Sequence, residues 1–354
     1  MKFIHIADVH LFSEPLGDAD WEKNRPKEIE ETFEKVIDIC NEKDIDLLLI
    51  AGGLFDKSPT LEQIKIVDEK LGRLEKARTV MIAGSCDYIP ADSEVASYKF
   101  NSRTVLIPPG KTINAYLKGI NTCVTGFSYA QPEYTERVLE NINPGREDAV
   151  NILLGHGGGK TTMPFRKEVI AKKGFDYVAM GYIRKPVHIL RNRMAYAGSL
   201  EPLSPEETGR HGIIMGEITD QGTTINWDPI ARRSYVEIVI TLSPGLSNDE
   251  IVANLEEKMM KLGNENIYTI TLKGFSAESV RLDLTRIKNR FNILEVKNLV
   301  ITETDKNILK EENDNNVLGG FIKEVERSYS VDDSMRRNAL RYGLEALIMA
   351  GDNK

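Results

Sequence analysis

Short apolar runs that each stop at a glycine or an unusual polar residue constrain the fold of this chain more than any other feature. Five such runs lie in its first 180 residues: Lys2–Ala7, Asp46–Ala51, Thr79–Ala83, Asn151–Leu154 and Tyr177–Met180. Runs of this kind, bounded by glycine, are typical of buried strands. The residues that come directly after them are Asp8, Gly52, Gly84, Gly155 and Gly181. Each expected strand therefore leads into a turn that can carry functional side chains.

Apolar residues at helical spacing lie between the first strands. One face consists of Ile29, Phe33, Val36, Ile37 and Cys40, and the next of Leu61, Ile64, Val67, Leu71 and Leu74. This spacing predicts amphipathic helices that each bury one side. Alternating strands and helices predict an α/β layered sheet with helices outside it. In such sheets the functional loops lie beyond the carboxyl ends of the strands.

The order of these patterns predicts three parts. We expect a first domain over residues 1–230, closed by antiparallel strands at Met194–Ala197, Gly212–Ile218 and Thr223–Trp227. A second α/β domain over residues 231–304 has strands and helices at Val236–Thr241, Asp249–Leu262, Ile267–Leu272, Leu282–Arg290 and Ile293–Ile301. Residues 305–354 are predicted to form a polar linker and a helical tail. The tail has an apolar stripe of Leu340, Leu344, Leu347 and Ile348.

Charge and cysteine usage narrow the functional classes. The formal net charge is -8, whereas a dedicated nucleic-acid binder usually has a basic surface. A basic cluster at Arg184, Lys185, Arg191 and Arg193 has two interpretations, a local nucleic-acid contact or a solvated face. The three cysteines are scattered, which predicts reduced thiols and a cytoplasmic location. No apolar run approaches the roughly 20 residues that span a bilayer, so no membrane association is expected.

The turns after the five strands carry motifs in a defined order. They are Asp8-x-His10, Gly52-Gly53-Leu54-Phe55-Asp56, Gly84-Ser85-Cys86-Asp87, Gly155-His156-Gly157 and Gly181-Tyr182-Ile183-Arg184. This order resembles the five motifs of calcineurin-like metallophosphoesterases, and most of all those of SbcD-type DNA-repair exonuclease subunits. One motif alone would be weak, but five in order at compatible spacings are specific.

The resemblance implies a fold and a type of site. The fold would be a four-layer α/β/β/α metallophosphoesterase sandwich with a smaller α/β capping domain and a helical C-terminal tail. The site would hold two metal ions about 3.5–4 Å apart, of the kind that Mn, Fe or Zn provides, and would hydrolyse phosphate esters. Asp56 and Asp87 match positions that are structural in this family, so no catalysis is assigned to them.

Most of the metal ligands that the resemblance implies are missing from this chain. Gly53 stands where the family has the aspartate that bridges both metals, and Ser85 and Cys86 stand where it has asparagine and the catalytic histidine. Tyr182 and Arg184 replace the closing His-x-His pair. We therefore expect no metal to bind tightly, and Mn, Fe or Zn only if the site is functional. The residual ligands are Asp8, His10 and His156.

Each of these residues has a second interpretation. Asp8 and His10 are either residual metal ligands or turn formers, and His156 is either a weak ligand or a loop residue between glycines. Cys86 is either a nucleophile or an inert thiol, because the sequence places no base beside it. Arg184 puts a fixed positive charge where a cation would sit, which either repels metal or makes an anion site in the emptied pocket.

Three functions are open from the sequence. We favour an SbcD-like subunit that keeps the fold, has lost two-metal catalysis and acts as a scaffold. The alternative is an active phosphodiesterase or exonuclease with a rebuilt or single-metal site, and the third is a phosphate- or nucleotide-binding module. The tail either packs onto the capping domain or docks onto an SbcC-type ATPase, as the resemblance implies. DNA binding and a homodimer also follow from the resemblance alone, and the net charge does not support DNA.

Overall fold

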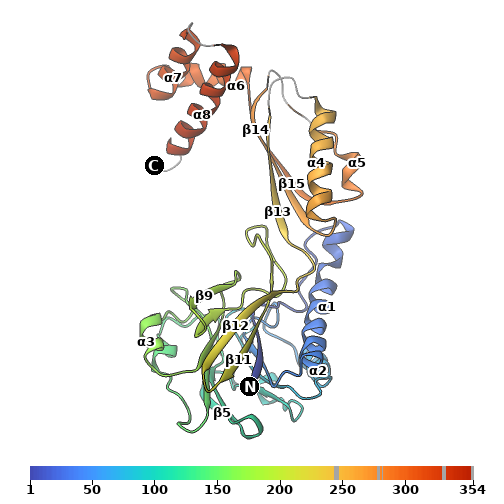
Figure 1. Cartoon of the computed structure of the whole chain (residues 1–354), viewed down its shortest axis with the longest axis vertical. Coiled ribbons are helices and arrows are strands. Elements are labelled where there is room, and N and C mark those ends of the chain that lie inside the picture. The colour runs from blue at the N-terminus through green and yellow to red at the C-terminus, as the bar shows by residue number, and fades with distance from the viewer. Residues whose placement is uncertain (243–246, 277–279, 281, 329–331, 352–354) are drawn as a thin grey trace. The chain divides into compact units, whose positions relative to one another are not determined.

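The computed structural model describes residues 1–242, 247–276, 280, 282–328 and 332–351 (Figure 1). Contacts divide the chain into two compact units, Met1–Ser234 and Tyr235–Lys354, called unit 1 and unit 2 below. The further division at residue 304 into a capping domain and a tail stays a prediction. Among the described residues, no helix is both long enough and apolar enough to cross a membrane.

Unit 1 contains two six-stranded sheets, of which the first has the order β12-β11-β1-β2-β3-β4. Its strands are β1 (Lys2–Ile6), β2 (Leu47–Ala51), β3 (Arg78–Ile82), β4 (Thr104–Leu106), β11 (Gly212–Thr219) and β12 (Gly222–Pro229). Strands β1 to β4 run parallel, and Ile4 lies opposite Leu48. On the other side of β1, β11 and β12 form an antiparallel hairpin, as the sequence predicts for these two runs.

The second sheet has the order β5-β6-β7-β8-β10-β9. Its strands are β5 (Thr112–Leu117), β6 (Thr122–Phe127), β7 (Val150–His156), β8 (Tyr177–Gly181), β9 (Val187–Leu190) and β10 (Met194–Tyr196). The prediction that Met194–Ala197 is an antiparallel strand is wrong in part, because β10 is antiparallel only to β9 and runs parallel to β8. The short strand β9 reverses the chain after β8, so β10 returns in the direction of β8. Short 3-10 turns occur at η1 (Val95–Ser97) and η2 (Lys118–Ile120).

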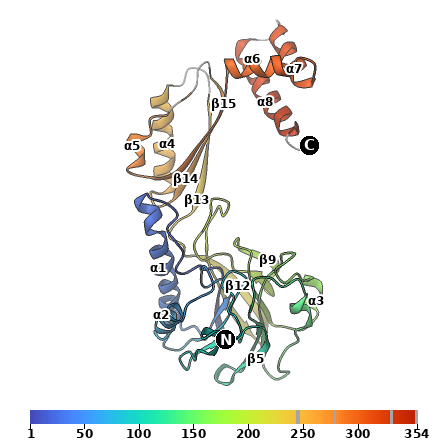
Figure 2. The same ribbon diagram turned by 180° about the vertical axis from the view of Figure 1, so that it is seen from behind.

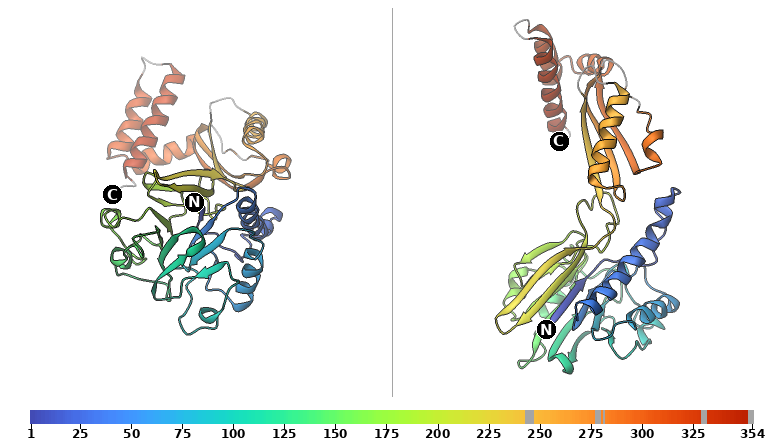
Figure 3. Two further views of the ribbon diagram at one scale, coloured as in Figure 1. Left: turned by 60° about the horizontal axis from the view of Figure 1, so that its bottom comes forward. Right: turned by 45° about the vertical axis from the view of Figure 1, so that its right-hand side comes forward.

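Helices cover the outer faces of the two sheets and give unit 1 four layers (Figure 2, Figure 3). Helices α1 (Asp20–Glu42) and α2 (Leu61–Leu71) pack on the first sheet and bury most of the two predicted apolar faces. Helix α3 (Lys167–Ala171) and the 3-10 turn η3 (Val138–Asn141) cover the second sheet. The layer between the sheets consists of apolar side chains from both. The predicted four-layer α/β/β/α fold is confirmed.

A histidine is buried between the two sheets. The ring of His5 on β1 has its Nδ1 3.0 Å from the hydroxyl of Tyr177 on β8. Burial lowers the pKa of His5 from 6.5 to about 3, although a hydrogen bond with the Met180 backbone acts in the opposite direction. Folding therefore favours neutral His5. Its titration leaves stability unchanged above about pH 6.5 and reduces stability increasingly as the pH falls toward about 3.

We expect wild-type protein to lose about 2 kcal/mol more unfolding free energy than a His5→Gln variant between about pH 6.5 and about pH 5, since each pH unit is worth about 1.4 kcal/mol. Urea unfolding at each pH measures this difference. His188→Gln, at an exposed position on β9, is the control and should keep the wild-type pH dependence. Equal pH dependence in His5→Gln and wild type would contradict a buried, uncharged ring.

Unit 2 begins with a three-stranded parallel sheet that helices cover on one face (Figure 1). Its strands, in spatial order, are β13 (Tyr235–Leu242), β14 (Ile267–Ser276) and β15 (Asn292–Thr302). Helices α4 (Asn248–Leu262) and α5 (Thr285–Lys288) pack on the sheet through an apolar core. These elements follow the predicted pattern, except that α5 occupies only part of the predicted helix Leu282–Arg290.

Three helices end the described chain: α6 (Glu303–Glu312), α7 (Val317–Arg327) and α8 (Asp333–Gly351). The segment predicted to be a polar linker is therefore largely helical. Thr302 caps α6, because its hydroxyl accepts from the Asp305 N–H and the Asp305 carboxylate accepts from the Thr302 N–H. Leu340 and Leu344 of the predicted stripe pack in a small core with α7. The side chain of Ile348 lies outside the described residues.

Candidate active site

The five motifs meet at one end of the two sheets, at the carboxyl ends of β1, β2 and β3 of the first and of β7 and β8 of the second. The backbone N–H groups of Asp8 and His10 donate to the carbonyls of Gly52 and Gly53, at 3.0 and 2.9 Å. Asp8 and His10 have positive φ values of 50° and 57°, a conformation that costs non-glycine residues about 1–2 kcal/mol. Hydrogen bonds to the next strand end thus hold this turn in a strained shape.

Asp87, which follows β3, fixes the neighbouring turns with four hydrogen bonds. Its Oδ1 accepts from the N–H groups of Gly53 and Gly84 at 3.0 and 2.6 Å. Its Oδ2 accepts from those of Leu54 and Phe55 at 2.8 and 3.3 Å. Only 2% of Asp87 is exposed, and its carboxylate oxygens accept hydrogen bonds from backbone N–H groups rather than from water. These contacts agree with the structural role that the resemblance implies for Asp87.

Asp8 occupies the space next to Gly53. Its buried side chain accepts a 2.9 Å hydrogen bond from the backbone N–H of Tyr182. Burial raises the pKa of Asp8, while His156 and other neighbours act to lower it. A Cβ on Gly53, whose φ is 66°, would lie 2.8 Å from both the Cα and the Oδ1 of Asp8. A bridging carboxylate at residue 53 would therefore require the Asp8 backbone to move.

Both retained histidines have their Nδ1 bonded to an oxygen. Nδ1 of His10 is 3.0 Å from Asp56 Oδ1, and Nδ1 of His156 is 2.8 Å from the Ala51 carbonyl oxygen. Because both partners accept, we assign the proton to Nδ1 in each ring, which leaves a lone pair on Nε2. Metal-ligating histidines usually have this arrangement.

The substituted positions contribute packing to the site. Ser85 and Cys86 lie in the turn after β3, and the Cys86 Sγ is 3.7 Å from the Phe55 carbonyl oxygen. Burial raises the pKa of Cys86, and two nearby carboxylates act in the same direction. The sulfur therefore stays a thiol near neutral pH, which disfavours a nucleophilic role. The Tyr182 ring stands edge-on to His156, with the ring centroids 5.8 Å apart.

Arg184 is anchored by a buried glutamate to which sequence reasoning assigned no role. Its Nη1 donates to Glu207 Oε1 at 3.2 Å, and 42% of the Arg184 side chain stays exposed. Glu207 Oε2 also accepts from the Ser199 hydroxyl at 2.6 Å and from the Leu203 N–H at 3.2 Å. The His211 Nδ1 lies 2.9 Å from the Ser199 hydroxyl oxygen and completes the network. The guanidinium is thus held in place from one side.

The sequence of unit 1 matches a known protein family. The family model described as calcineurin-like phosphoesterase matches residues 1–181, just over half of the chain. The chain belongs to the calcineurin-like phosphoesterase family. This result confirms the family that the order of the five motifs predicts.

Similarity to one curated protein of this family narrows the assignment. The chain is 27% identical over 259 residues to the DNA double-strand break repair protein Mre11 of Methanopyrus kandleri. The match covers 64% of this chain and 56% of Mre11, so the chain spans little more than half the length of that relative. The similarity supports the predicted SbcD-type membership.

Calcineurin-like phosphoesterases are typically metal-dependent, and two-metal chemistry needs ligands that surround both ions. Gly53 supplies no bridging carboxylate in this member of the family. In the part of the chain that the structure describes, no three His, Cys, Asp or Glu side chains gather closely enough to hold a metal ion. The site thus has Asp8, His10 and His156 at neighbouring strand ends without a closed ligand set. The residues present do not fit a two-metal centre.

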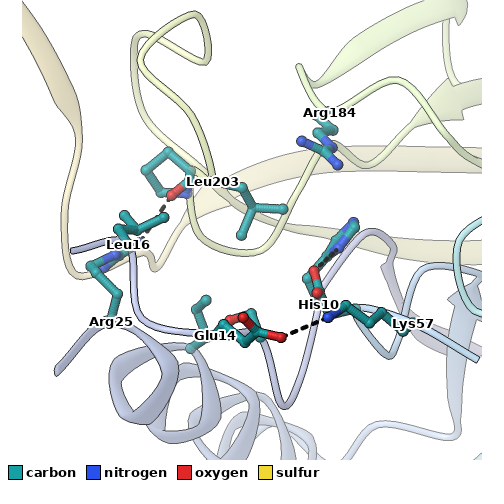
Figure 4. A pocket seen from close by; sticks show the side chains of 11 residues that line it. His10, Glu14, Leu16, Arg25, Lys57, Arg184 and Leu203 are labelled. Atoms are coloured by element: carbon teal, nitrogen blue, oxygen red, sulfur yellow. Dashed lines mark hydrogen bonds and ion pairs between the residues drawn. The ribbon is translucent and has the colours of Figure 1, made fainter. Parts of the chain in front are cut away.

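A cavity of about 290 Å³ opens beside His10 (Figure 4). It is lined by His10, Ser13, Glu14, Leu16, Arg25, Ile29, Asp56, Lys57, Arg184, Pro202 and Leu203. The motifs in the sequence contain only His10, Asp56 and Arg184 of these residues, because the others lie on α1 and in loops outside the motifs. The available signal was position, because Ser13, Glu14 and Leu16 directly follow the Asp8-x-His10 motif and Lys57 directly follows Asp56.

Proposed function

We propose that this chain is an SbcD-like subunit that has lost two-metal catalysis and acts as a non-catalytic scaffold. The observation that carries the proposal is the crowding at Gly53, where the Cβ of a bridging residue would lie 2.8 Å from the Asp8 backbone. Backbone hydrogen bonds and the Asp87 carboxylate hold the motif turns, so their shape does not require a metal ion. The motif turns keep their shape through hydrogen bonds, although the bridging carboxylate is missing. This combination supports a scaffold role rather than hydrolysis.

An active phosphodiesterase or exonuclease with a single metal ion is the alternative. It is favoured by His10 and His156, because each ring keeps an Nε2 lone pair while its Nδ1 is bonded. Asp8 would have to provide a third donor, and one of its oxygens already accepts the Tyr182 N–H. Arg184 adds a fixed positive charge that acts on Asp8, which disfavours a cation there. These contacts make the scaffold the better supported function.

We further propose that α6, α7 and α8 dock onto an SbcC-type ATPase. Apolar side chains stay exposed on α7 and α8, at Val317 (74%), Met335 (56%) and Tyr342 (61%). A role in DNA repair, a homodimer and a cytoplasmic location are proposed from the family likeness, and the net charge of -8 argues against DNA as the main partner. Separate elution of the chain and a purified SbcC-type ATPase in size-exclusion chromatography would contradict the docking proposal.

Metal content and turnover separate the two candidate functions. Protein purified with Mn²⁺ is expected to hold far less than one metal ion per chain and to leave bis(p-nitrophenyl) phosphate intact. Two metal ions per chain, with turnover that His10→Ala abolishes, would refute the scaffold proposal. One metal ion per chain with turnover would establish the alternative. Gly53→Asp is expected to restore neither property, because the Asp8 backbone leaves no room for its Cβ.

A further inference from the structure

Strand β13 forms one edge of the sheet in unit 2, because among the described residues it pairs with β14 alone. The pairing runs from Tyr235 to Leu242 without a register shift. In a strand that is paired on one side, every second residue points its backbone N–H and C=O groups away from the neighbouring strand. No described strand pairs with these groups in residues 237–242. This edge can therefore accept a further strand.

The two edges of this sheet differ in their protection against further pairing. The edge strand β15 carries the charged residues Glu295 and Lys297, and its pairing with β14 has a register shift at Thr269. Charges and bulges both discourage the addition of another strand. Strand β13 has a single charged residue, Glu237, and no proline, and Val239 in its middle is 43% exposed. The β13 edge is therefore the more open of the two.

A cavity of about 180 Å³ lies between the β13 edge and helix α4, and is far larger than the space that one water molecule needs. Its lining residues come from these two elements and are Ile240, Thr241, Glu250, Ile251, Asn254 and Lys258. Ile251, Asn254 and Lys258 are three or four residues apart, so they form a stripe along one side of α4. A strand added to β13 would point every second side chain toward this stripe. The cavity can take one such side chain, and Ile240 and Ile251 make it apolar.

The two charged residues that line the cavity are not equally available to a ligand. Glu250 belongs to the N-terminal cap of α4, where its carboxylate accepts from the Ser247 N–H at 2.9 Å and from the Ser247 hydroxyl at 2.8 Å. Lys258 is exposed and makes no ion pair with any residue that the structure describes. The groove thus presents a positive charge at the Lys258 end, which favours an acidic group there.

We propose that an extended segment of a partner protein adds to β13 as a fourth strand, with an apolar side chain in the cavity and an acidic side chain beside Lys258. In strand addition, backbone hydrogen bonds supply affinity and pockets for alternate side chains supply specificity. A second copy of β13 fits this groove less well. Its Ile238 and Ile240 are only 4% and 7% exposed in a core shared with α4, so they cannot enter the cavity of another copy. The inference does not depend on the loss of two-metal catalysis.

Fluorescence anisotropy of the full chain with a labelled peptide tests this inference. The probe is fluorescein-Gly-Thr-Val-Thr-Val-Thr-Glu-Thr-amide, in which the valines and the glutamate point to one face of a strand. It should bind saturably. Two further peptides carry an N-methyl group on one or the other of the two central residues. One of them should bind about tenfold or more weakly and the other much less so, because only alternate N–H groups face β13.

Variants of α4 test the groove itself. Lys258→Gln should weaken the probe by about threefold, which is the size of an exposed ion pair. Lys288→Gln removes the same charge from an exposed position on α5 outside the groove, and should bind as wild type does. Asn254→Phe introduces a ring into the cavity from an exposed helix position and should abolish binding. Unfolding midpoints close to that of wild type would establish that the variants are folded.

Several results would overturn the inference. They are no binding of the probe, equal binding of both N-methylated peptides, and equal affinities in Lys258→Gln and Lys288→Gln. Light scattering after size-exclusion chromatography tests the second copy as occupant. A dimer that the peptide converts to monomers would show that the β13 edge joins two copies of this chain, and would also contradict the inference. Metal content and turnover bear only on the scaffold proposal, so the two proposals can fail separately.

Discussion

Replacing Asp87 with alanine should lower the free energy of unfolding by about 4 kcal/mol or more. The carboxylate accepts hydrogen bonds from the backbone of Gly53, Leu54, Phe55 and Gly84. All of these residues are buried, so water cannot readily take the place of the lost acceptor. Each buried N–H group left without a partner costs about 1–3 kcal/mol. Urea unfolding monitored by circular dichroism measures the change.

Two further variants bracket the Asp87 result. Asp92→Ala, at an exposed position shortly after the turn, should change the unfolding free energy by less than about 0.5 kcal/mol. Asp87→Asn keeps the shape of the side chain but replaces one acceptor oxygen by an NH₂ group that faces backbone donors. It should therefore behave more like Asp87→Ala than like wild type. A loss below about 1 kcal/mol in Asp87→Ala would show that the carboxylate does not hold the turns.

Glu28→Ala, on the buried side of α1, should cause a second large loss of stability. Glu28 accepts from Arg25 Nη1 at 2.8 Å and from Arg233 Nε at 2.7 Å, and Arg25 also contacts Glu201 at 3.2 Å. All four side chains are buried. The substitution leaves two buried guanidinium groups short of one negative charge, which costs about 3–5 kcal/mol. Because Arg233 lies at the end of unit 1, the network joins α1 to that end.

Glu31, about one turn further along α1, provides the matched control. It pairs with Lys27 at 3.6 Å and with Arg232 at 3.1 Å, and all three side chains are largely exposed. Exposed ion pairs contribute about 0–1 kcal/mol, so Glu31→Ala should fall in that range in the same urea experiment. Similar losses in Glu28→Ala and Glu31→Ala would mean that burial does not determine the strength of these pairs.

The fold could be predicted where the local pattern was strong. The five apolar runs and the two helical faces became β1, β2, β3, β7, β8, α1 and α2. Strands β4, β5, β6 and β9 were not anticipated. Strands β5 and β9 lie at the edges of their sheet with mostly exposed or half-exposed side chains, and β4 is very short. Strands β5 and β9 pair only with β6 and β10, their neighbours along the chain, so what hid them is their mainly polar or exposed pattern. Strand β4 pairs with β3, about 25 residues earlier, and a local pattern does not indicate such pairing.

The sequence predicts which residues lie at the site, but it does not predict which of their side chains touch. The motifs place Asp8, His10 and His156 at strand ends, and the structure brings those ends together. Nothing in the sequence indicates that Gly53 has no room for a side chain, because that depends on its distance from Asp8 across two strands. The contact between Glu207 and Arg184 likewise joins two separate loops and has no periodic signal.

The left-handed backbone at Asp8 and His10 is held by backbone hydrogen bonds, so the shape of this turn does not depend on metal-ligand side chains. In a metal-binding relative, coordination would help to offset the cost of such a conformation. In this chain, hydrogen bonds to Gly52 and Gly53 also hold it. A mutation that removes one metal-ligand side chain would therefore leave this turn folded. A fold of this kind can outlast the reaction for which its loops were first shaped.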